Sequence, residues 1–296
     1  MQSFSRGWSF LKQAWQMAFK DKDLLKPSLY ALIVGMIISV IGIIPIILVA
    51  MLMGGSEVGN IVLFVLGAIL IFVQFIVSYV FSAMTVYLIY GYLSEGDGRM
   101  DKAWGIVKRD FFDILTLAAV STLVNLLKNA ANKNSKGIGA SIARAGAGLL
   151  QTLWTEAALL VLPAMVIDDL NLKKSLERIW EITKTNLLLI GISTVGVKWV
   201  TGLIGFLLGL IGAVIGIAIG GGAAYASGDP IVIAIGIGVG VLIFFFFVMV
   251  ASVISTYTGT AYHTCLYIWA RDVEAAREKG KTGQVAAPAP LAAVLS

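Results

Sequence analysis

Charged residues are scarce in this chain. They make up 13% of its 296 residues, whereas apolar residues make up 58%. Typical soluble domains are about 25% charged and about 45–50% apolar. This imbalance excludes an ordinary soluble globular protein, a disordered chain and a nucleic-acid-binding arm. It predicts a polytopic membrane protein that has no nucleic-acid partner.

The residues that build metal and redox sites are almost missing as well. The single cysteine, Cys265, excludes an intrachain disulfide framework and a thiolate metal cluster within one chain. The single histidine, His263, excludes a two-histidine metal site and a chain of histidine proton relays. The sequence also lacks the His-Glu-x-x-His, Gly-x-Ser-x-Gly and Walker motifs. We therefore expect a protein that is not an enzyme and that carries no cofactor and no metal.

Long apolar runs take the place of these features. A bilayer core of about 30 Å needs about 20 apolar residues of helix. Six runs are candidates: Ser28–Met53, Val58–Tyr90, Phe111–Leu127, Ile138–Val166, Asn186–Gly220 and Ile231–Ala270. The second would reach roughly 50 Å as a helix, so it has to tilt or project into water at one end. The first is too long for the apolar part of a cleaved signal peptide, so we expect it to remain as a membrane helix.

The placement of lysine and arginine predicts the orientation of these spans, because loops rich in these residues stay on the cytoplasmic side. Of the 22 basic residues, 17 lie before the first span, after the second and fourth spans, and in the C-terminal tail. The turns Gly54–Glu57 and Gly221–Pro230 have none. The pattern predicts a protein of the cell (inner) membrane with both termini in the cytoplasm.

One loop disagrees with this topology. Four basic residues surround the turn between the third and fourth spans, which the topology places outside: Lys128, Lys133, Lys136 and Arg144. Either this hairpin crosses the membrane despite its charge, or it is re-entrant and stays on the cytoplasmic side. Crossing is the favoured interpretation, because four agreeing loops outweigh one exception.

A short motif occurs before each of the three pairs of spans. It reads basic, any, Trp, any, apolar, any, Lys, and it occurs at Arg6–Lys12, Lys102–Lys108 and Arg178–Lys184. Tryptophan and lysine four residues apart lie on one helix face, and both side chains favour the headgroup level of a membrane. The flanking apolar residues have the spacing of amphipathic helices, with Asp101 and Asn171 as expected N-caps of the second and third.

The motif predicts three related units, about 4–90, 101–167 and 171–270, followed by a flexible cytoplasmic tail, 271–296. Each unit is a transmembrane hairpin preceded by a cytoplasmic amphipathic interfacial helix, which gives an all-α membrane protein with six transmembrane helices. The candidate membrane-interface residues are Trp8, Lys12, Trp15, Trp104, Lys108, Trp180 and Lys184. A plainer alternative is that tryptophan and lysine mark interfaces in all membrane proteins, which explains each motif alone but not their matching positions.

Three parts of the sequence resemble a known family. They are FSRGWSFLKQAW followed by KDKDLL, then EGDGRMDKAW, and then LPAMVIDDLNLKKSLERIWEITKTN. They are similar to an uncharacterised family of six-span prokaryotic integral membrane proteins and, more distantly, to the membrane domains fused to some glycerophosphodiester phosphodiesterases. The resemblance covers roughly residues 4–270 and implies a six-helix fold in a prokaryotic membrane. It implies no established activity, so it assigns no catalytic residue.

Three ionisable residues lie within the predicted spans, where charges are expensive and often functional. They are Asp113, Glu156 and Lys198. The functional interpretation is a polar path or ion-coupled site that uses a Glu156–Lys198 pair. The polar half of span two would face the same cavity: Gln74, Ser78, Tyr79, Ser82, Thr85 and Tyr87. The structural interpretation, an interhelical ion pair that fixes packing, is favoured, because proton-coupled transport normally uses more buried polar groups. Asp113 lies near the start of its span and fits an interfacial position.

Glycine is concentrated in the fifth span, at spacings of three or four residues. The candidate helix-packing residues are Gly205, Gly209, Gly212, Gly216 and Gly220. Such a face lets another helix approach closely. It predicts either a tight intrachain hairpin with the sixth span, which the short turn Gly221–Pro230 favours, or a seam between subunits of a homo-oligomer or pore.

Two smaller features have weaker functional interpretations. Asp168 and Asp169 could hold Mg²⁺ in a lipid-modifying enzyme, but two acids before a basic amphipathic helix are more typical of N-terminal helix charges. His263 could ligate a haem or chlorin, although a hydrogen bond to a neighbouring group is the favoured interpretation.

The leading functional hypothesis is a non-enzymatic structural, assembly or lipid-organising component of a bacterial membrane. Its expected partners are membrane lipids, above all anionic ones, because each basic residue near the surface contributes about 1 kcal/mol of attraction. A second copy of the chain or another membrane protein is a further expected partner. The alternative is a transporter or channel with an intramembrane Glu156/Lys198 polar site.

Overall fold

The computed structural model describes residues 2–133, 138–227, 229–280 and 285–295. Within these ranges the chain is helical and has no strand. Six helical segments are long and apolar enough to cross a membrane: Lys22–Met53, Glu57–Glu95, Phe111–Asn132, Ser141–Asp168, Val197–Ala223 and Pro230–Glu278. The prediction of an all-α chain with six candidate spans is therefore confirmed, and the fold is that of a multi-pass membrane protein. Lys136 of the basic turn lies outside the described residues.

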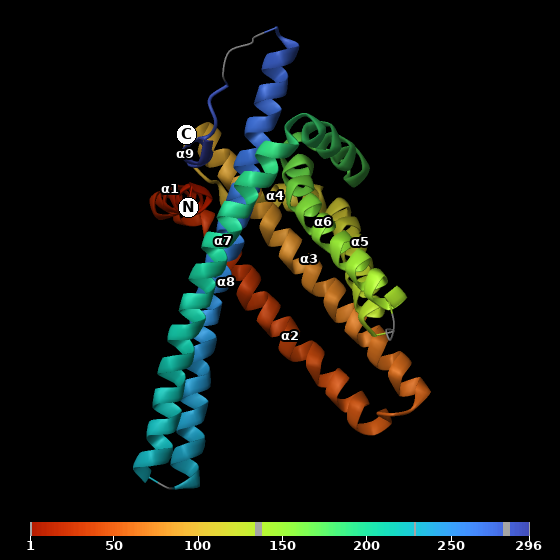
Figure 1. Ribbon diagram of the computed structural model, residues 1–296, viewed down its shortest axis with the longest axis vertical. Helices are drawn as coiled ribbons and strands as arrows, with labels where there is room; N and C mark the ends of the chain where they lie inside the picture. The colour runs from red at the N-terminus through yellow and green to blue at the C-terminus, as the bar shows by residue number, and fades with distance from the viewer. Residues whose placement is uncertain (1, 134–137, 228, 281–284, 296) are drawn as a thin grey trace.

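Figure 1 shows the arrangement of the helices, which form two arms that meet near one end of the molecule. The elements are α1 (Gln2–Lys20), the short 3-10 helix η1 (Lys22–Leu24), α2 (Lys26–Met53), α3 (Glu57–Glu95), α4 (Met100–Arg109), α5 (Phe111–Lys133), α6 (Ile138–Asp168), α7 (Leu172–Ser227), α8 (Pro230–Glu278) and α9 (Ala289–Leu295). One arm consists of α7 and α8, and the other contains α2, α3, α5 and α6.

Long helices that follow one another in the chain pack together: α2 on α3, α5 on α6 and α7 on α8. Between α2 and α3, the Gln74 side-chain amide donates to the Gly35 carbonyl at 2.9 Å and to the Ser39 hydroxyl at 2.7 Å. These bonds replace water for polar groups that would otherwise face lipid. The relation of the three pairs as repeats of one unit stays a prediction.

The buried core lies at the end where the two arms meet. Its largest fully buried side chains come from α1, η1, α3, α5, α6 and α8: Phe10, Leu24, Leu88, Ile89, Ile114, Leu117, Leu162, Met165, Tyr257, Tyr262, Leu266 and Tyr267. Phe10 of α1 packs edge-to-face on Tyr262, with ring centroids 5.4 Å apart. The far halves of α2, α7 and α8 instead expose apolar side chains, such as Ile41 and Ile217, as helices that face lipid require.

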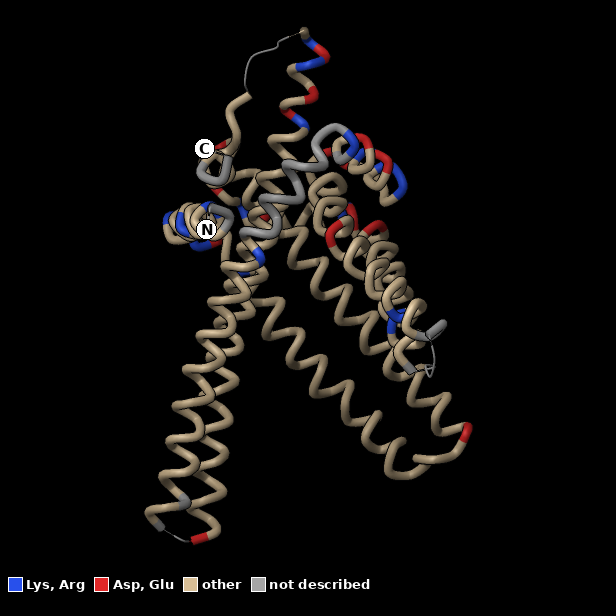
Figure 2. The backbone as a smooth tube through the Cα atoms, in the orientation of Figure 1, with Lys and Arg blue, Asp and Glu red and all other residues tan. Residues whose placement is uncertain are grey.

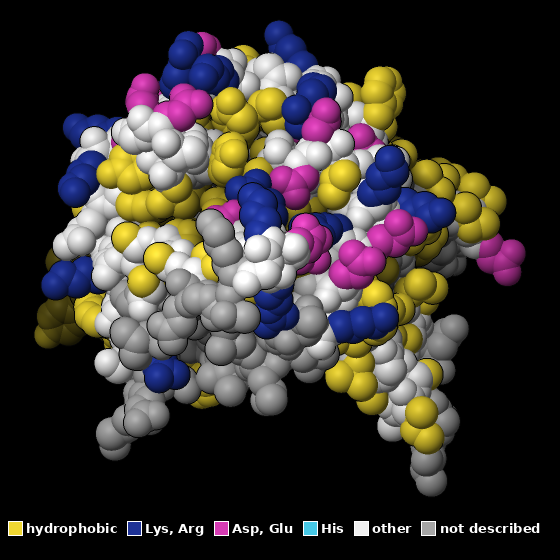
Figure 3. Space-filling model, turned by 90° about the horizontal axis from the view of Figure 1, so that it is seen from above, with side chains coloured by type: hydrophobic (Ala, Val, Ile, Leu, Met, Phe, Trp, Pro, Cys, Tyr) yellow, Lys and Arg dark blue, Asp and Glu magenta, His cyan; other side chains and the backbone are white. Residues whose placement is uncertain are grey.

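The charged residues gather at the same end as the core (Figure 2). Viewed from above, this face carries Lys and Arg side chains over its surface and along its edges, with hydrophobic side chains between them (Figure 3). The far halves of α2 and α7–α8 are nearly free of charge along their described length. The molecule is therefore polar at one end and apolar over most of its length.

The helix starts test the predicted N-caps. Asn171 caps α7 as predicted, since its side-chain oxygen accepts from the Lys174 backbone N–H at 3.0 Å. The prediction for Asp101 is wrong: Arg99 occupies the N-cap position of α4 in an extended conformation without a side-chain cap. Asp101 lies two residues later, inside the first turn of α4, and its carboxylate pairs with the Arg99 guanidinium at 2.9 Å.

The third motif does not form a separate helix. Its residues belong to α7, which continues without interruption into the fifth span. Figure 1 shows the first turns of α7 bent away from its long remainder, across the end of the molecule.

Near the C-terminus, within the segment expected to be flexible, α9 packs on α1 and buries Leu291 completely.

Candidate functional site

The three motif tryptophans are exposed on the surface of the protein. Their exposed fractions are similar: 50% for Trp8, 49% for Trp104 and 62% for Trp180. The residue before each tryptophan is buried: Gly7, Ala103 and Ile179. In each motif, one face of the helix therefore packs on the core, and the neighbouring face exposes the indole. We call residues 2–20, 100–109 and 172–184 together the tryptophan collar.

Helix α1 shows how the collar is built. At about 100° per residue, Phe10, Ala14 and Met17 form one face, which is buried in the core. Trp8 and Phe19 lie on a second apolar face, which is exposed. The remaining face of α1 is polar, so the helix has one buried face, one exposed apolar face and one polar face.

The collar residues do not all have the same role. Lys12, Lys108 and Lys184 are exposed, and the Lys184 ammonium lies 5.1 Å from the centre of the Trp180 ring. Trp15 is different, because its indole N–H donates to the Thr258 hydroxyl on α8 at 3.1 Å. Trp15 is therefore a packing residue that fastens α1 to α8.

A polar cavity of about 250 Å³ lies between α3, α6, α7 and α8. Its lining is rich in hydroxyl groups: Ser78, Ser82, Thr201, Ser255, Thr256 and Thr260. Lys198 and His263 complete the polar part of the wall. Only two of the polar residues noted in span two reach this cavity. Tyr79, by contrast, shares a hydrogen bond with the Ser121 hydroxyl at 2.7 Å.

The Lys198 and His263 side chains line this cavity, and both contact the Glu156 carboxylate of α6, which is not itself among the lining residues. The Lys198 ammonium of α7 forms an ion pair with the Glu156 carboxylate of α6. The other carboxylate oxygen of Glu156 lies 3.6 Å from Nε2 of His263 on α8. The His263 ring is buried, and its Nδ1 donates to the Gly259 carbonyl at 2.7 Å. The cavity therefore offers the Lys198 cation and the His263 imidazole to anything that enters it, with the Glu156 carboxylate in contact with both.

Asp113, the third ionisable candidate, lies in the first turn of α5, near Asp110. Burial raises the pKa of the Asp110 carboxyl, the hydrogen bond from Arg109 opposes this rise, and the nearby charge of Asp113 adds to it. Asp113 thus belongs to the charged end of the molecule, as its interfacial assignment requires.

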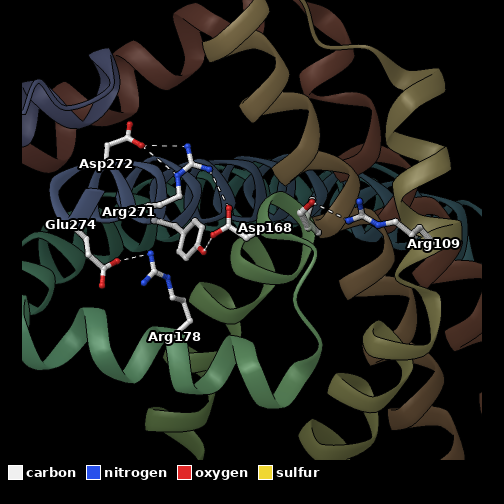
Figure 4. A network of polar contacts seen from close by, with 8 residues as sticks. Arg109, Asp168, Arg178, Arg271, Asp272 and Glu274 are labelled. Atoms are coloured by element: carbon white, nitrogen blue, oxygen red, sulfur yellow. Dashed lines mark hydrogen bonds and ion pairs between the residues drawn. The ribbon is translucent and has the colours of Figure 1, made fainter. Parts of the chain in front are cut away.

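A network of ion pairs holds Asp168 and Asp169 at the end of α6 (Figure 4). Asp168 accepts a hydrogen bond from the Tyr267 hydroxyl and pairs with Arg271 at 3.2 Å. Asp169 pairs with Arg109 at 3.0 Å. Among the described residues, no group of three or more His, Cys, Asp or Glu side chains is arranged to hold a metal ion. Each aspartate instead faces an arginine, which makes this a tie between α4, α6 and α8.

The glycines of α7 divide into two groups. A Cβ added at Gly216 would lie 2.6 Å from the Gly240 carbonyl oxygen, and one at Gly220 would lie 3.5 Å from the Ile237 backbone. A Cβ added at Gly212 would lie 2.9 Å from the Phe247 Cβ. A Cβ on Gly205 or Gly209 would instead meet nothing within 4 Å. Half of the glycine face is thus used by the α7–α8 pair, and the other half is open.

Sequence reasoning missed the part of the cavity that α8 supplies. From the sequence, His263 had no assigned partner, and the hydroxyl-bearing segment Ser255–Thr260 was not predicted to line a site. The signal was present, because such a run is unusual inside an otherwise apolar span. Which face of α8 these groups occupy depends on how α8 packs against α6 and α7.

Comparison with known proteins does not assign the chain to a family. No family model matches the sequence, and no curated protein matches it.

Proposed function

We propose that the protein is a non-enzymatic, lipid-organising or assembly component of a bacterial inner membrane that acts through the tryptophan collar. The observation that carries this proposal is the equivalence of the three motifs: each buries the residue before its tryptophan and exposes the indole. Indole rings favour the headgroup level, and neighbouring lysines attract anionic lipids.

The topology that accompanies this function has both termini and the collar in the cytoplasm. It is supported by the gathering of charge at the end where α1 and α9 lie. In this topology the three motifs lie at the membrane interface in three related units, and the chain has the six-helix fold implied by the prokaryotic family that the sequence resembles. A second copy of the chain or another membrane protein would bind beside the collar, among the lipids that the collar attracts.

The proposal is tested by lipid selectivity. The purified protein is exchanged into micelles that contain phosphatidylglycerol and phosphatidylcholine, and bound lipids are counted by native mass spectrometry. The combined variant Lys12→Gln, Lys108→Gln and Lys184→Gln should lower the preference for phosphatidylglycerol at least tenfold, since each lysine contributes about 1 kcal/mol. The matched control is Lys128→Gln on α5, outside the collar. An unchanged preference in the collar variant would reject the proposal.

A second candidate function is ion-coupled transport, and the cavity with Glu156, Lys198 and His263 favours it. Proteoliposomes that contain a pH-sensitive dye would report a proton flux through this site. Lys198→Met should abolish the flux while the unfolding temperature stays the same. If wild-type protein shows no flux, and Lys198→Met only lowers stability, transport through this pair is excluded.

A further inference from the structure

The length of α7 allows the cavity to lie at the headgroup level of one leaflet. From Lys198 to Tyr225, α7 rises about 40 Å at 1.5 Å per residue, and a bilayer measures about 40–45 Å including its headgroups. Tyr225, next to the turn between α7 and α8, is 97% exposed, and tyrosine is a typical interface residue. With this turn at the outer surface, Lys198 reaches the headgroups of the cytoplasmic leaflet.

The charges at the cavity suit a ligand that carries both signs. The side chains of Lys198 and Glu156 are 51% and 29% exposed, so both can be reached. A simple anion that bound Lys198 would lie against the Glu156 carboxylate. A zwitterion instead satisfies both groups, and the surrounding serine and threonine hydroxyls can donate to its oxygens.

An open strip leads from the cavity along α7. Gly202, Gly205 and Gly209 follow Lys198 at four, seven and eleven residues, so all four lie on one helix face. A Cβ built on any of these three glycines would meet nothing within 4 Å. The strip runs from the headgroup level toward the hydrocarbon core, and an acyl chain can lie along it.

We propose that the cavity binds the headgroup of a phospholipid that ends in ethanolamine phosphate. The phosphate lies on Lys198 and the ammonium on Glu156, because the phosphate joins the headgroup to the glycerol and must be nearer the strip on α7. One acyl chain follows Gly202, Gly205 and Gly209. This inference rests on the proposed lipid-organising function and names the lipid at one site.

The test compares two lipids with identical acyl chains on the full-length protein. The comparison uses the combined collar variant Lys12→Gln, Lys108→Gln and Lys184→Gln, so that phosphatidylglycerol held by the collar does not mask the cavity. Native mass spectrometry in micelles should then show phosphatidylethanolamine bound at least about tenfold more than phosphatidylglycerol, since the ammonium–carboxylate contact is lost in the latter. The exchange variant Glu156→Lys with Lys198→Glu keeps an ion pair but reverses its direction. It should unfold at the wild-type temperature and lose phosphatidylethanolamine about tenfold. Equal occupancy by the two lipids overturns the proposal.

A third variant separates a lipid from a free solute of the same chemistry. Gly205→Leu fills the strip and leaves the cavity lining intact. It should lower phosphatidylethanolamine occupancy about tenfold, while free ethanolamine phosphate, followed by calorimetry, binds it as it binds wild type. If this variant binds phosphatidylethanolamine as wild type does, the ligand is a free zwitterion and not a lipid, and the proposal is overturned. The lysine variants of the collar lie outside the cavity, so a failed collar test rejects the proposed function without changing this measurement.

Discussion

Adding one methyl group at Gly216 should drive α7 and α8 apart. The Cβ of Gly216→Ala would lie 2.6 Å from the Gly240 carbonyl oxygen, whereas a carbon–oxygen contact needs about 3.3 Å. The obstacle is backbone, so it cannot rotate away, and α8 would have to shift by roughly 0.7 Å to restore that contact. Overpacking of this kind costs about 1–3 kcal/mol.

The matched control is Gly209→Ala on the same face of the same helix. The added Cβ would meet nothing within 4 Å, and alanine favours a helix over glycine by up to about 1 kcal/mol. Gly209→Ala should therefore unfold at the wild-type temperature or slightly above it.

The assay is thermal unfolding of both variants in the same detergent, with subunit number measured by native mass spectrometry. The expected result is a lower unfolding temperature for Gly216→Ala alone, with subunit number unchanged. If both variants unfold at the same temperature, the close approach of Gly216 to Gly240 does not hold the α7–α8 pair. If Gly216→Ala instead changes only the subunit number, the glycine face is a seam between copies of the chain.

Three further changes test how the charged end is held together. Tyr267→Phe removes the hydroxyl that donates to Asp168 and should lower the free energy of unfolding by about 1–3 kcal/mol; an unchanged denaturation midpoint would contradict this tie. Trp15→Phe keeps an aromatic ring but loses the hydrogen bond to Thr258. The free energy of unfolding should fall by about 1 kcal/mol, and wild-type stability would show that the bond contributes nothing. Leu291→Ala removes the fully buried side chain of α9, at a cost of about 2–5 kcal/mol; hydrogen exchange should then rise in α9 but not in α3, and equal protection in α9 would refute its docking on α1.

The six spans were predictable because apolar length is a local property of the sequence. Hydropathy does not distinguish burial in lipid from burial in protein, however, and α3 shows the difference. Its residues near Leu88 and Ile89 are fully buried in the core, whereas Ile61 and Phe64 are exposed. The predicted span Val58–Tyr90 is longer than one membrane crossing requires, and its excess length forms part of the core at the charged end.

The candidate site was predictable only in part. Glu156 and Lys198 stood out because charges are rare in apolar segments, and the structure pairs them. His263 and its hydroxyl neighbours could not be added from the sequence, because their place depends on the rotation of α8 against α6 and α7. The helix start at Arg99 was missed because Arg99 has no capping side chain, so residue type did not reveal the extended backbone that makes it the N-cap.

The sequence by itself determined that this is a helical membrane protein with six candidate spans, since the membrane imposes a length and a polarity that each segment must meet alone. It also determined the three tryptophan motifs. Only the tertiary structure decided which glycines of α7 pack on α8 and which stay open, because equal spacing along one helix does not say how near its neighbour lies. The same holds for the cavity: its polar side chains come from α3, α7 and α8, and they meet one another and Glu156 of α6 only through helix packing.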